Sequence, residues 1–270
     1  MWKLLQIEWL KLKNYKTFNR LAIVYFILLL LILSSVKLLL SWMQSSGVEF
    51  QGISPSIIPF YDFPDVWQNL TYLASYLKFF LGFIVIISVT NEYSFRTIRQ
   101  NIIDGMSPQS FLWSKQFMIF TFSLVNVVVL FLSGTLMGLL HSPSFEPHLF
   151  FTGMDFLLAH FLELITFLNL CMLLSLLLKK SGFAIIALCF YGLILEPALV
   201  GFLNYKFDDH WLISLFPIHA VNNLIEIPFQ RYVFMEIQNY VALGSFLIAL
   251  GWYFLSLFFN YLLIAKRDIA

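Results

Sequence analysis

Charged side chains are scarce in this chain. Asp, Glu, Lys and Arg make up 11% of its 270 residues, whereas 60% of the residues are hydrophobic. A water-soluble domain has about a quarter of its residues charged, so the composition excludes an ordinary soluble protein. The formal net charge of +1 provides no strongly basic surface, and we expect no nucleic-acid partner.

Cysteines and the common catalytic motifs are also scarce. The two cysteines, Cys171 and Cys189, both lie in apolar runs, which gives neither a disulfide framework nor a metal-ligand spacing. The chain contains no G-x-x-x-x-G-K-S/T phosphate loop and no H-E-x-x-H zinc motif. We therefore expect no nucleotide site and no metal site on this chain.

Long apolar runs dominate the sequence instead. A helix of about 20 apolar residues crosses the roughly 30 Å of hydrocarbon in a bilayer. These runs are continuous rather than alternating with a period of two, which predicts helices and not strands. We expect an all-α membrane protein that forms a single transmembrane domain over residues 1–270. The expected spans are 21–43, 70–90, 117–140, 156–178, 183–203 and 240–265.

Basic residues indicate how these spans are oriented. Six spans place both termini on one side, together with the connections between spans two and three and between spans four and five. By the positive-inside rule, the side richer in Lys and Arg is cytoplasmic. We therefore expect a multi-pass protein of the cytoplasmic (inner) membrane with both termini in the cytoplasm. That side holds 12 of the 16 basic residues: Lys3, Lys11, Lys13, Lys16, Arg20, Arg96, Arg99, Lys115, Lys179, Lys180, Lys266 and Arg267.

The first residues of the chain form an amphipathic pattern. In residues 1–18, apolar positions cover about half of a helical wheel, with Lys3, Gln6 and Lys13 opposite them. This pattern predicts an interfacial helix that lies along the membrane surface ahead of the first span.

A polar segment, residues 91–115, separates the second and third spans. Phe95, Ile98 and Ile102 recur at three- and four-residue spacing and form one apolar stripe of a helix, while Arg96 and Arg99 point away from it. A connection between adjacent spans needs only a few residues. Its length and order indicate a cytoplasmic partner, and the alternative is an interfacial helix that only anchors the spans.

Stop and start signals follow that predicted helix. Asp104 and Gly105 end it, and Gly105 suits a left-handed cap. Ser107 and Pro108 then begin a second helix, with Ser as N-cap and Pro at the first helical position. We expect a short helix, a tight corner, and a helix that leads into the third span.

The same segment resembles a family motif. Residues 92–107 (EYSFRTIRQNIIDGMS), followed by FLWSK at 111–115, resemble the segment after the second span in ABC-2 type transporter permeases. There an E-Y/F-x-x-x-T-x-R run, a short turn with Ser or Thr, and a Phe-containing stretch that ends in Lys precede the third span. Residues 7–13 (IEWLKLK) are similar to the family's N-terminal interfacial helix. The motifs cover about 40 residues, and the architecture covers the whole chain.

This resemblance implies the permease subunit of an ATP-driven exporter. In the family, the loop between spans two and three is a coupling helix that docks on an ATP-binding subunit. Because this chain has no phosphate loop, ATP would bind to that separate subunit, and the chain itself would carry no cofactor and no enzymatic activity. A second permease chain, identical or different, is also implied. The implied docking residues are Phe95, Arg96, Thr97, Ile98, Arg99, Asp104 and Gly105.

Five side chains of Lys, His or Glu lie inside the expected spans: Lys37, Lys78, His160, Glu163 and Glu196. A charge at mid-membrane costs a few kcal/mol, so such residues should face the bundle interior and pair. We expect Lys78 to pair with Glu163 or Glu196, which have a similar expected depth. An alternative interpretation of Glu196 is that, beside Pro197, it only marks the end of a helix.

Two other functional classes stay open. His160 and Glu163 share one helical face, which admits an intramembrane metal-dependent hydrolase. The absence of an H-E-x-x-H motif and of paired catalytic carboxylates argues against it. A non-transporting membrane scaffold or sensor is the third class, and the lack of a soluble domain argues mildly against it. Gly134 and Gly138 would permit close helix approach, either within the chain or between two chains.

Overall fold

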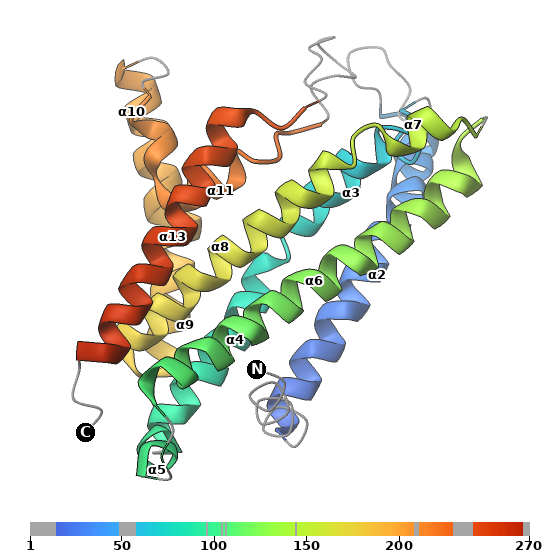
Figure 1. The fold of residues 1–270 in the computed structure, drawn as a ribbon. Coiled ribbons are helices and arrows are strands. Elements are labelled where there is room, and N and C mark those ends of the chain that lie inside the picture. The colour runs from blue at the N-terminus through green and yellow to red at the C-terminus, as the bar shows by residue number, and fades with distance from the viewer. Residues whose placement is uncertain are drawn as a thin grey trace.

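The regular structure of the chain is helical wherever the computed structural model describes it, in residues 15–48, 58–95, 97–103, 105, 107–143, 145–207, 211–228 and 240–266 (Figure 1). The α-helices, the π-helix η2 and the 3-10 helix η3 follow one another along the chain. They are α2 (Lys16–Ser45), α3 (Val66–Ser75), α4 (Lys78–Ser94), α5 (Thr97–Ile103), α6 (Pro108–His141), α7 (Pro147–Phe151), α8 (Asp155–Leu178), α9 (Ser181–Cys189), η2 (Phe190–Leu195), α10 (Glu196–Phe207), η3 (Ile213–Leu215), α11 (Pro217–Asn222) and α13 (Leu243–Lys266).

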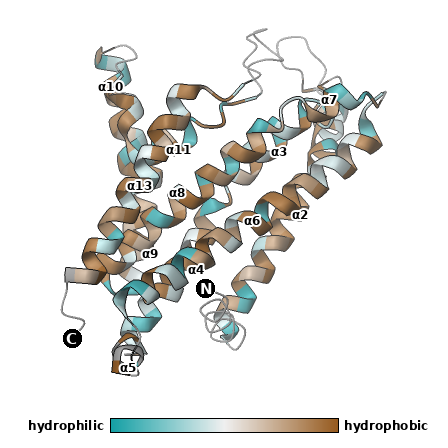
Figure 2. Ribbon diagram, in the orientation of Figure 1, coloured by the Kyte–Doolittle hydropathy of each residue, from teal (hydrophilic) through white to brown (hydrophobic). Residues whose placement is uncertain are grey.

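Five helical segments of the described chain are long and apolar enough to cross a membrane. They are α2, α6, Pro147–Leu178, Ser181–Phe207 and Leu243–Ala265. The pair α3 and α4, bent by 45°, makes a sixth candidate if it counts as one broken span. Hydrophobic residues dominate the long helices in Figure 2. The chain is thus an all-α, multi-pass membrane protein with five or six spans, as the apolar runs predicted.

Two expected spans are less regular than predicted. The span at 70–90 is broken at Tyr76 and Leu77, where α3 ends and α4 begins. Neither proline nor glycine occupies this break. The hydroxyls of Thr71 and Ser75 donate to the carbonyls of Trp67 and Thr71 just before it, a local contact that bends helices. The span at 183–203 contains the six-residue π-helix η2 between α9 and α10. The two segments lie where spans were predicted, but hydropathy predicted neither the break nor the π-helix.

The ends of the helices agree with an even number of crossings. α2 begins, α5 lies and α13 ends at the same end of the bundle, and α7 lies at the opposite end (Figure 1). Which end faces the cytoplasm stays a prediction. Of the expected interfacial helix, residues 1–14 lie outside the described residues, and residues 16–18 belong to α2.

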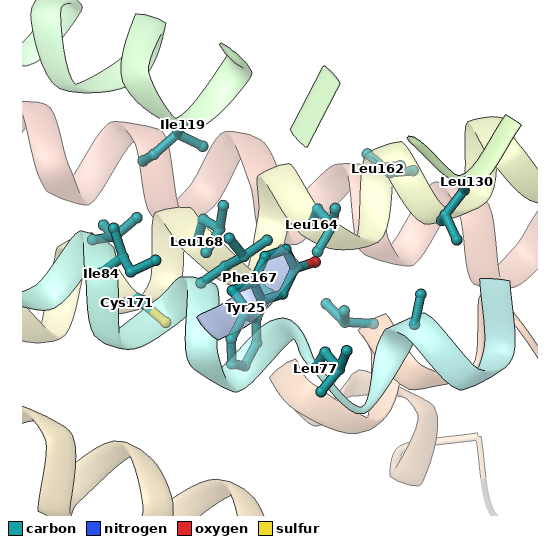
Figure 3. Close-up of a cluster of buried hydrophobic side chains, with 14 of the residues drawn as sticks. Tyr25, Leu77, Ile84, Ile119, Leu130, Leu162, Leu164, Phe167, Leu168 and Cys171 are labelled. Atoms are coloured by element: carbon teal, nitrogen blue, oxygen red, sulfur yellow. The ribbon is translucent and has the colours of Figure 1, made fainter. Parts of the chain in front are cut away.

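Helix α8 is the centre of the bundle. It packs against α3, α4, α6, α9, α11 and α13, and most of its side chains are buried. Figure 3 shows Phe167 and Cys171 of α8 among buried side chains from α2, α4 and α6. A Cβ on Gly82 of α4 would come within 2.8 Å of the Cys171 Sγ atom, so this glycine permits the close approach of α4 to α8.

The two glycines of α6 pack inside the chain. A Cβ at Gly134 would lie 2.7 Å from the Trp67 ring, and one at Gly138 would lie 2.2 Å from the Phe63 ring. The sequence left open whether these glycines allow close packing within one chain or between two chains. Both of them pack within this chain.

Candidate functional site

A buried ion pair joins α4 to α8. The Lys78 Nζ atom lies 2.6 Å from the Glu163 Oε1 atom, and the two side chains are 4% and 1% exposed. Charges withdrawn from water need a close partner of opposite sign. Of the two partners considered for Lys78, Glu163 is the one in contact.

Two further elements meet at this pair. The Ser75 hydroxyl of α3 donates to Glu163 Oε2 at 2.6 Å, and the Lys78 ammonium donates to Asn222 Oδ1 of α11 at 2.5 Å. Ser75 and Lys78 flank the break between α3 and α4. The bend thus lets both side chains reach the same carboxylate on α8, which supplies a tertiary reason for a break without proline or glycine.

The polar contacts continue from Glu163 across the bundle. The His160 Nδ1 atom lies 2.9 Å from Glu163 Oε2, and its Nε2 atom lies 3.0 Å from Asn126 Oδ1 of α6. The Asn126 amide is also hydrogen-bonded to the hydroxyl of Tyr25 in α2. The side chains of these four residues are buried, and the aromatic body of Tyr25 packs among apolar neighbours (Figure 3). Together with Lys78 they form a continuous buried polar chain from α2 to α4.

A cavity of about 550 Å³ adjoins the Lys78 end of this chain. It lies between the break of α3 and α4, the π-helix η2, and α11, and both Lys78 and Glu163 line it. Its volume falls within the range of small-molecule sites, about 300–1,000 Å³. Irregular helices at ionisable groups are typical of intramembrane binding sites. This is the candidate site.

Glu196 has a different position from the one that pairing with Lys78 would need. Its Oε1 atom accepts a hydrogen bond from the backbone N–H of His219 at 2.5 Å, so the carboxylate holds the first turn of α11. The helical path also continues through Glu196 from η2 into α10. Glu196 therefore lies at the boundary between η2 and α10, and its carboxylate also binds α11, the helix that carries Asn222.

Several members of the site were absent from the sequence-based prediction. Tyr25 and Asn126 interrupt apolar runs, and a polar residue inside a span is expected to have a partner, so a signal for them was present. Ser75 is too common a residue to stand out. Asn222 lies outside the expected spans, and nothing in the local sequence indicates that it reaches Lys78.

The 91–115 segment differs in detail from the predicted helix, corner and helix. α4 continues to Ser94, Phe95 lies in a turn, and α5 begins at Thr97. The predicted start and stop signals are confirmed. Gly105 has φ +92°, and the Ser107 hydroxyl accepts a hydrogen bond from the Ser110 N–H at 3.1 Å ahead of Pro108.

A second buried ion pair holds this segment to the bundle. The Lys115 Nζ atom of α6 lies 3.2 Å from Glu92 Oε1 of α4, and the side chains are 1% and 6% exposed. The Thr97 hydroxyl donates to the other oxygen of Glu92. The first residue of α5 is therefore bound to α4, and through Glu92 to α6. Glu92 and Lys115 are the outer residues of the family-like motif, and their pairing was missed because they lie 23 positions apart.

The other implied docking residues divide into two groups. Ile98 is buried against the bundle, while Phe95 is 67% exposed. Ile103, which is not one of the implied docking residues, lies at the end of α5 and is 72% exposed. Arg96 and Asp104 lie outside the described residues, as do the side chains of Arg99 and Ile102.

No protein-family model matches this chain, and comparison with curated proteins finds no match either. The ABC-2 resemblance therefore depends on the residues of the 91–115 segment, on residues 7–13 and on the arrangement of the spans.

Proposed function

We propose that this chain is the membrane-spanning permease subunit of an ABC-2 type exporter, powered by ATP hydrolysis on a separate ATP-binding subunit. It would reside in the cytoplasmic membrane with both termini in the cytoplasm, alongside a second permease chain of the same or a different kind. The single observation that carries the proposal is α5, a short helix between the second and third spans that is bound to α4 and, through Glu92 of α4, linked to α6.

The contacts of α5 suit a coupling role. Thr97 holds α5 to Glu92, and the Glu92–Lys115 pair joins α4 to α6. A force on α5 would therefore act on two spans at once. The exposed side chains of Phe95 and Ile103 leave apolar surface for contact with lipid or with a partner.

Helix α4 links α5 to the candidate site. It runs for 17 residues from Lys78 to Ser94, about 25 Å at 1.5 Å per residue. Lys78 lies at one end beside the cavity, and Glu92 lies in the last turn beside α5. A displacement of α5 on ATP binding would thus move Lys78 relative to Glu163 on α8, which is how docking would change access to the cavity.

The test is a charge reversal on α5. An ATP-binding subunit encoded beside this chain's gene is co-expressed with it and purified in detergent through a tag on the permease. We expect Arg99→Glu to abolish co-purification of the ATPase, or to uncouple its ATP hydrolysis from transport, because Arg99 belongs to the implied docking surface. Lys180→Glu is the matched control, since it makes the same charge change on the same expected face, between α8 and α9. Retention of both association and coupled transport in Arg99→Glu would refute this role of the residue.

The two alternatives have less support. A metal-dependent hydrolase needs three protein ligands, and no group of three His, Cys, Asp or Glu residues that could hold a metal occurs in the described part of the chain. A scaffold or sensor gives no reason for buried charges beside a cavity, and this argues against it. The exposed side chains of Phe95 and Ile103 are compatible with either class.

A further inference from the structure

We propose that the cavity beside Lys78 binds a zwitterionic amphiphile, a molecule with an anionic oxygen and an amine at one end and hydrocarbon at the other. The inference concerns binding alone and does not depend on the proposed ATP-binding partner. If the chain is an exporter, such an amphiphile is its candidate cargo.

The deep end of the cavity, formed by the buried side chains of Lys78 and Glu163, is suited to a ligand atom that accepts hydrogen bonds. Both oxygens of Glu163 already accept hydrogen bonds, from Lys78 at Oε1 and from Ser75 at Oε2, where His160 also lies within 2.9 Å. The Glu163 carboxylate therefore has little capacity left to accept a hydrogen bond from a ligand. An ammonium has three N–H groups, and Lys78 directs two of them at Glu163 and Asn222. Its Nζ atom also lies 5.5 Å from the centre of the Phe167 ring, and the third N–H makes no hydrogen bond among the described residues, so it is the one that an anionic ligand oxygen would take up. A phosphate or a carboxylate satisfies this requirement.

The mouth of the cavity carries the opposite charge. Glu226 lines it with an exposed side chain, and the backbone carbonyl of Glu226 is held to α3 by the Gln68 amide at 3.3 Å. Tyr72 and Tyr76, whose hydroxyls are 2.6 Å apart, line the same cavity. A carboxylate and aromatic rings together favour a cationic amine. The cavity thus presents a cation at its deep end and an anion at its mouth.

Apolar side chains make up the remaining walls. Phe79, Ile218 and Ile225 line the interior, while Leu193 and Ile227 line the cavity with side chains that are 59% and 49% exposed. Leu193 belongs to η2, where Phe190 and Ile194 are also exposed. A small soluble zwitterion has no hydrocarbon to bury against these apolar side chains, whereas an amphiphile would place its hydrocarbon along them.

Binding is tested on the full chain purified in a non-ionic detergent, by equilibrium titration with a radiolabelled lysophosphatidylethanolamine. Two lipids of equal chain length are compared with it: the anionic lysophosphatidylglycerol, which lacks the amine, and the uncharged monoacylglycerol. We expect saturable binding of one lysophosphatidylethanolamine per chain, and about tenfold weaker binding of the other two, which corresponds to about 1.4 kcal/mol.

Variants assign the site. Single changes at Lys78 leave a buried charge, so the double variant Lys78→Gln/Glu163→Gln is used, and it should lower the affinity for lysophosphatidylethanolamine about tenfold. Glu226→Gln should remove the preference over lysophosphatidylglycerol. Ile227→Trp should narrow the mouth and weaken binding without touching the buried charges. Lys37→Gln, a change of an exposed lysine on α2 outside this cavity, is the matched control and should bind as the unmodified chain does.

Three results would overturn the proposal: binding that does not saturate, equal affinity for all three lipids, or unchanged binding in the double and mouth variants. The assay contains no ATPase and measures no transport. Its failure would therefore leave the coupling test at Arg99 intact, and a negative result at Arg99 would leave the binding site intact.

Discussion

At the scale of single residues, the ion pair of Lys78 and Glu163 is the contact whose loss should destabilise the fold most. Both are buried at the centre of the bundle, and each is the charge partner of the other. Glu163 would retain Ser75 and His160 if Lys78 were replaced, whereas Lys78 would retain only the Asn222 contact among its described hydrogen bonds if Glu163 were replaced. The two single substitutions should therefore differ.

Neutralising one partner should destabilise the fold more than neutralising both. We expect Glu163→Gln to lower the free energy of unfolding by about 3–5 kcal/mol, because an uncompensated buried charge remains, and Lys78→Gln to lower it by less. The double variant should be closer to the unmodified chain than either single variant. Reversible unfolding in detergent measures this, with Lys37→Gln as the control for loss of an exposed lysine. Additive losses in the double variant would show that the two residues do not interact.

Asp62 offers a pH-dependent prediction outside the spans. Burial raises the pKa of Asp62 above its ordinary value of 3.8, Asp65 adds to the rise, and His141 and Lys37 oppose it. The folded state therefore holds this proton more tightly than the unfolded chain does, and stability from this group decreases as the pH rises from 3.8 through the raised pKa.

The substitution Asp62→Asn should thus stabilise the folded chain at neutral pH, with a gain that shrinks as the pH falls toward 3.8. The gain arises because asparagine has no carboxyl group, so no negative charge has to form in this partly buried loop at neutral pH. Thermal unfolding of both proteins over a series of pH values checks it. A difference between them that stays constant with pH would contradict the role of ionisation.

Among the elements, α6 shows how small residues set a helix position. Phe63 and Trp67 fill the space above Gly138 and Gly134, so the loop before α3 and α3 itself pack directly on the α6 backbone. Larger residues at these positions would push α6 away from α3.

Gly138→Ala should therefore destabilise the chain by about 1–3 kcal/mol, the usual cost of overpacking. The matched control is Gly251→Ala in α13, where an added Cβ meets nothing within 4 Å. There the better helix propensity of alanine should make the change neutral or stabilising by up to about 1 kcal/mol. Unfolding in detergent compares the two. If Gly138→Ala is as harmless as Gly251→Ala, the close contact with Phe63 does not constrain α6.

The broken span α3–α4 matters most for the whole molecule, because it decides between five and six crossings. If α3 and α4 together cross the bilayer, the start of α2 and the start of α6 share one side. If the pair turns back instead, they face opposite sides. α2 begins at the same end of the bundle as α5 (Figure 1), which favours six.

Cysteine accessibility tests this topology. In a variant with Cys171→Ala and Cys189→Ala, single cysteines replace Thr17, Ser46, Ser107 or Ser142. An impermeant maleimide added to intact cells should label positions 46 and 142 only, if positions 17 and 107 face the cytoplasm as the positive-inside rule predicts. Labelling of 107 together with 46 would indicate five crossings, and labelling of 17 and 107 alone would reverse the orientation.

The amino-acid sequence by itself determined the helical class, the places of the membrane spans, and the signals at Gly105, Ser107 and Pro108, because these depend on hydropathy and on residues close together in the chain. Only the tertiary structure decided the break at Tyr76, the π-helix before Glu196, the choice of Glu163 as the partner of Lys78, and the contacts of Asn222 with Lys78 and of Ser75 with Glu163. Residues as far apart as 78 and 222 become neighbours only when helices pack. The need to satisfy buried charges then overrides the local preference for a straight helix.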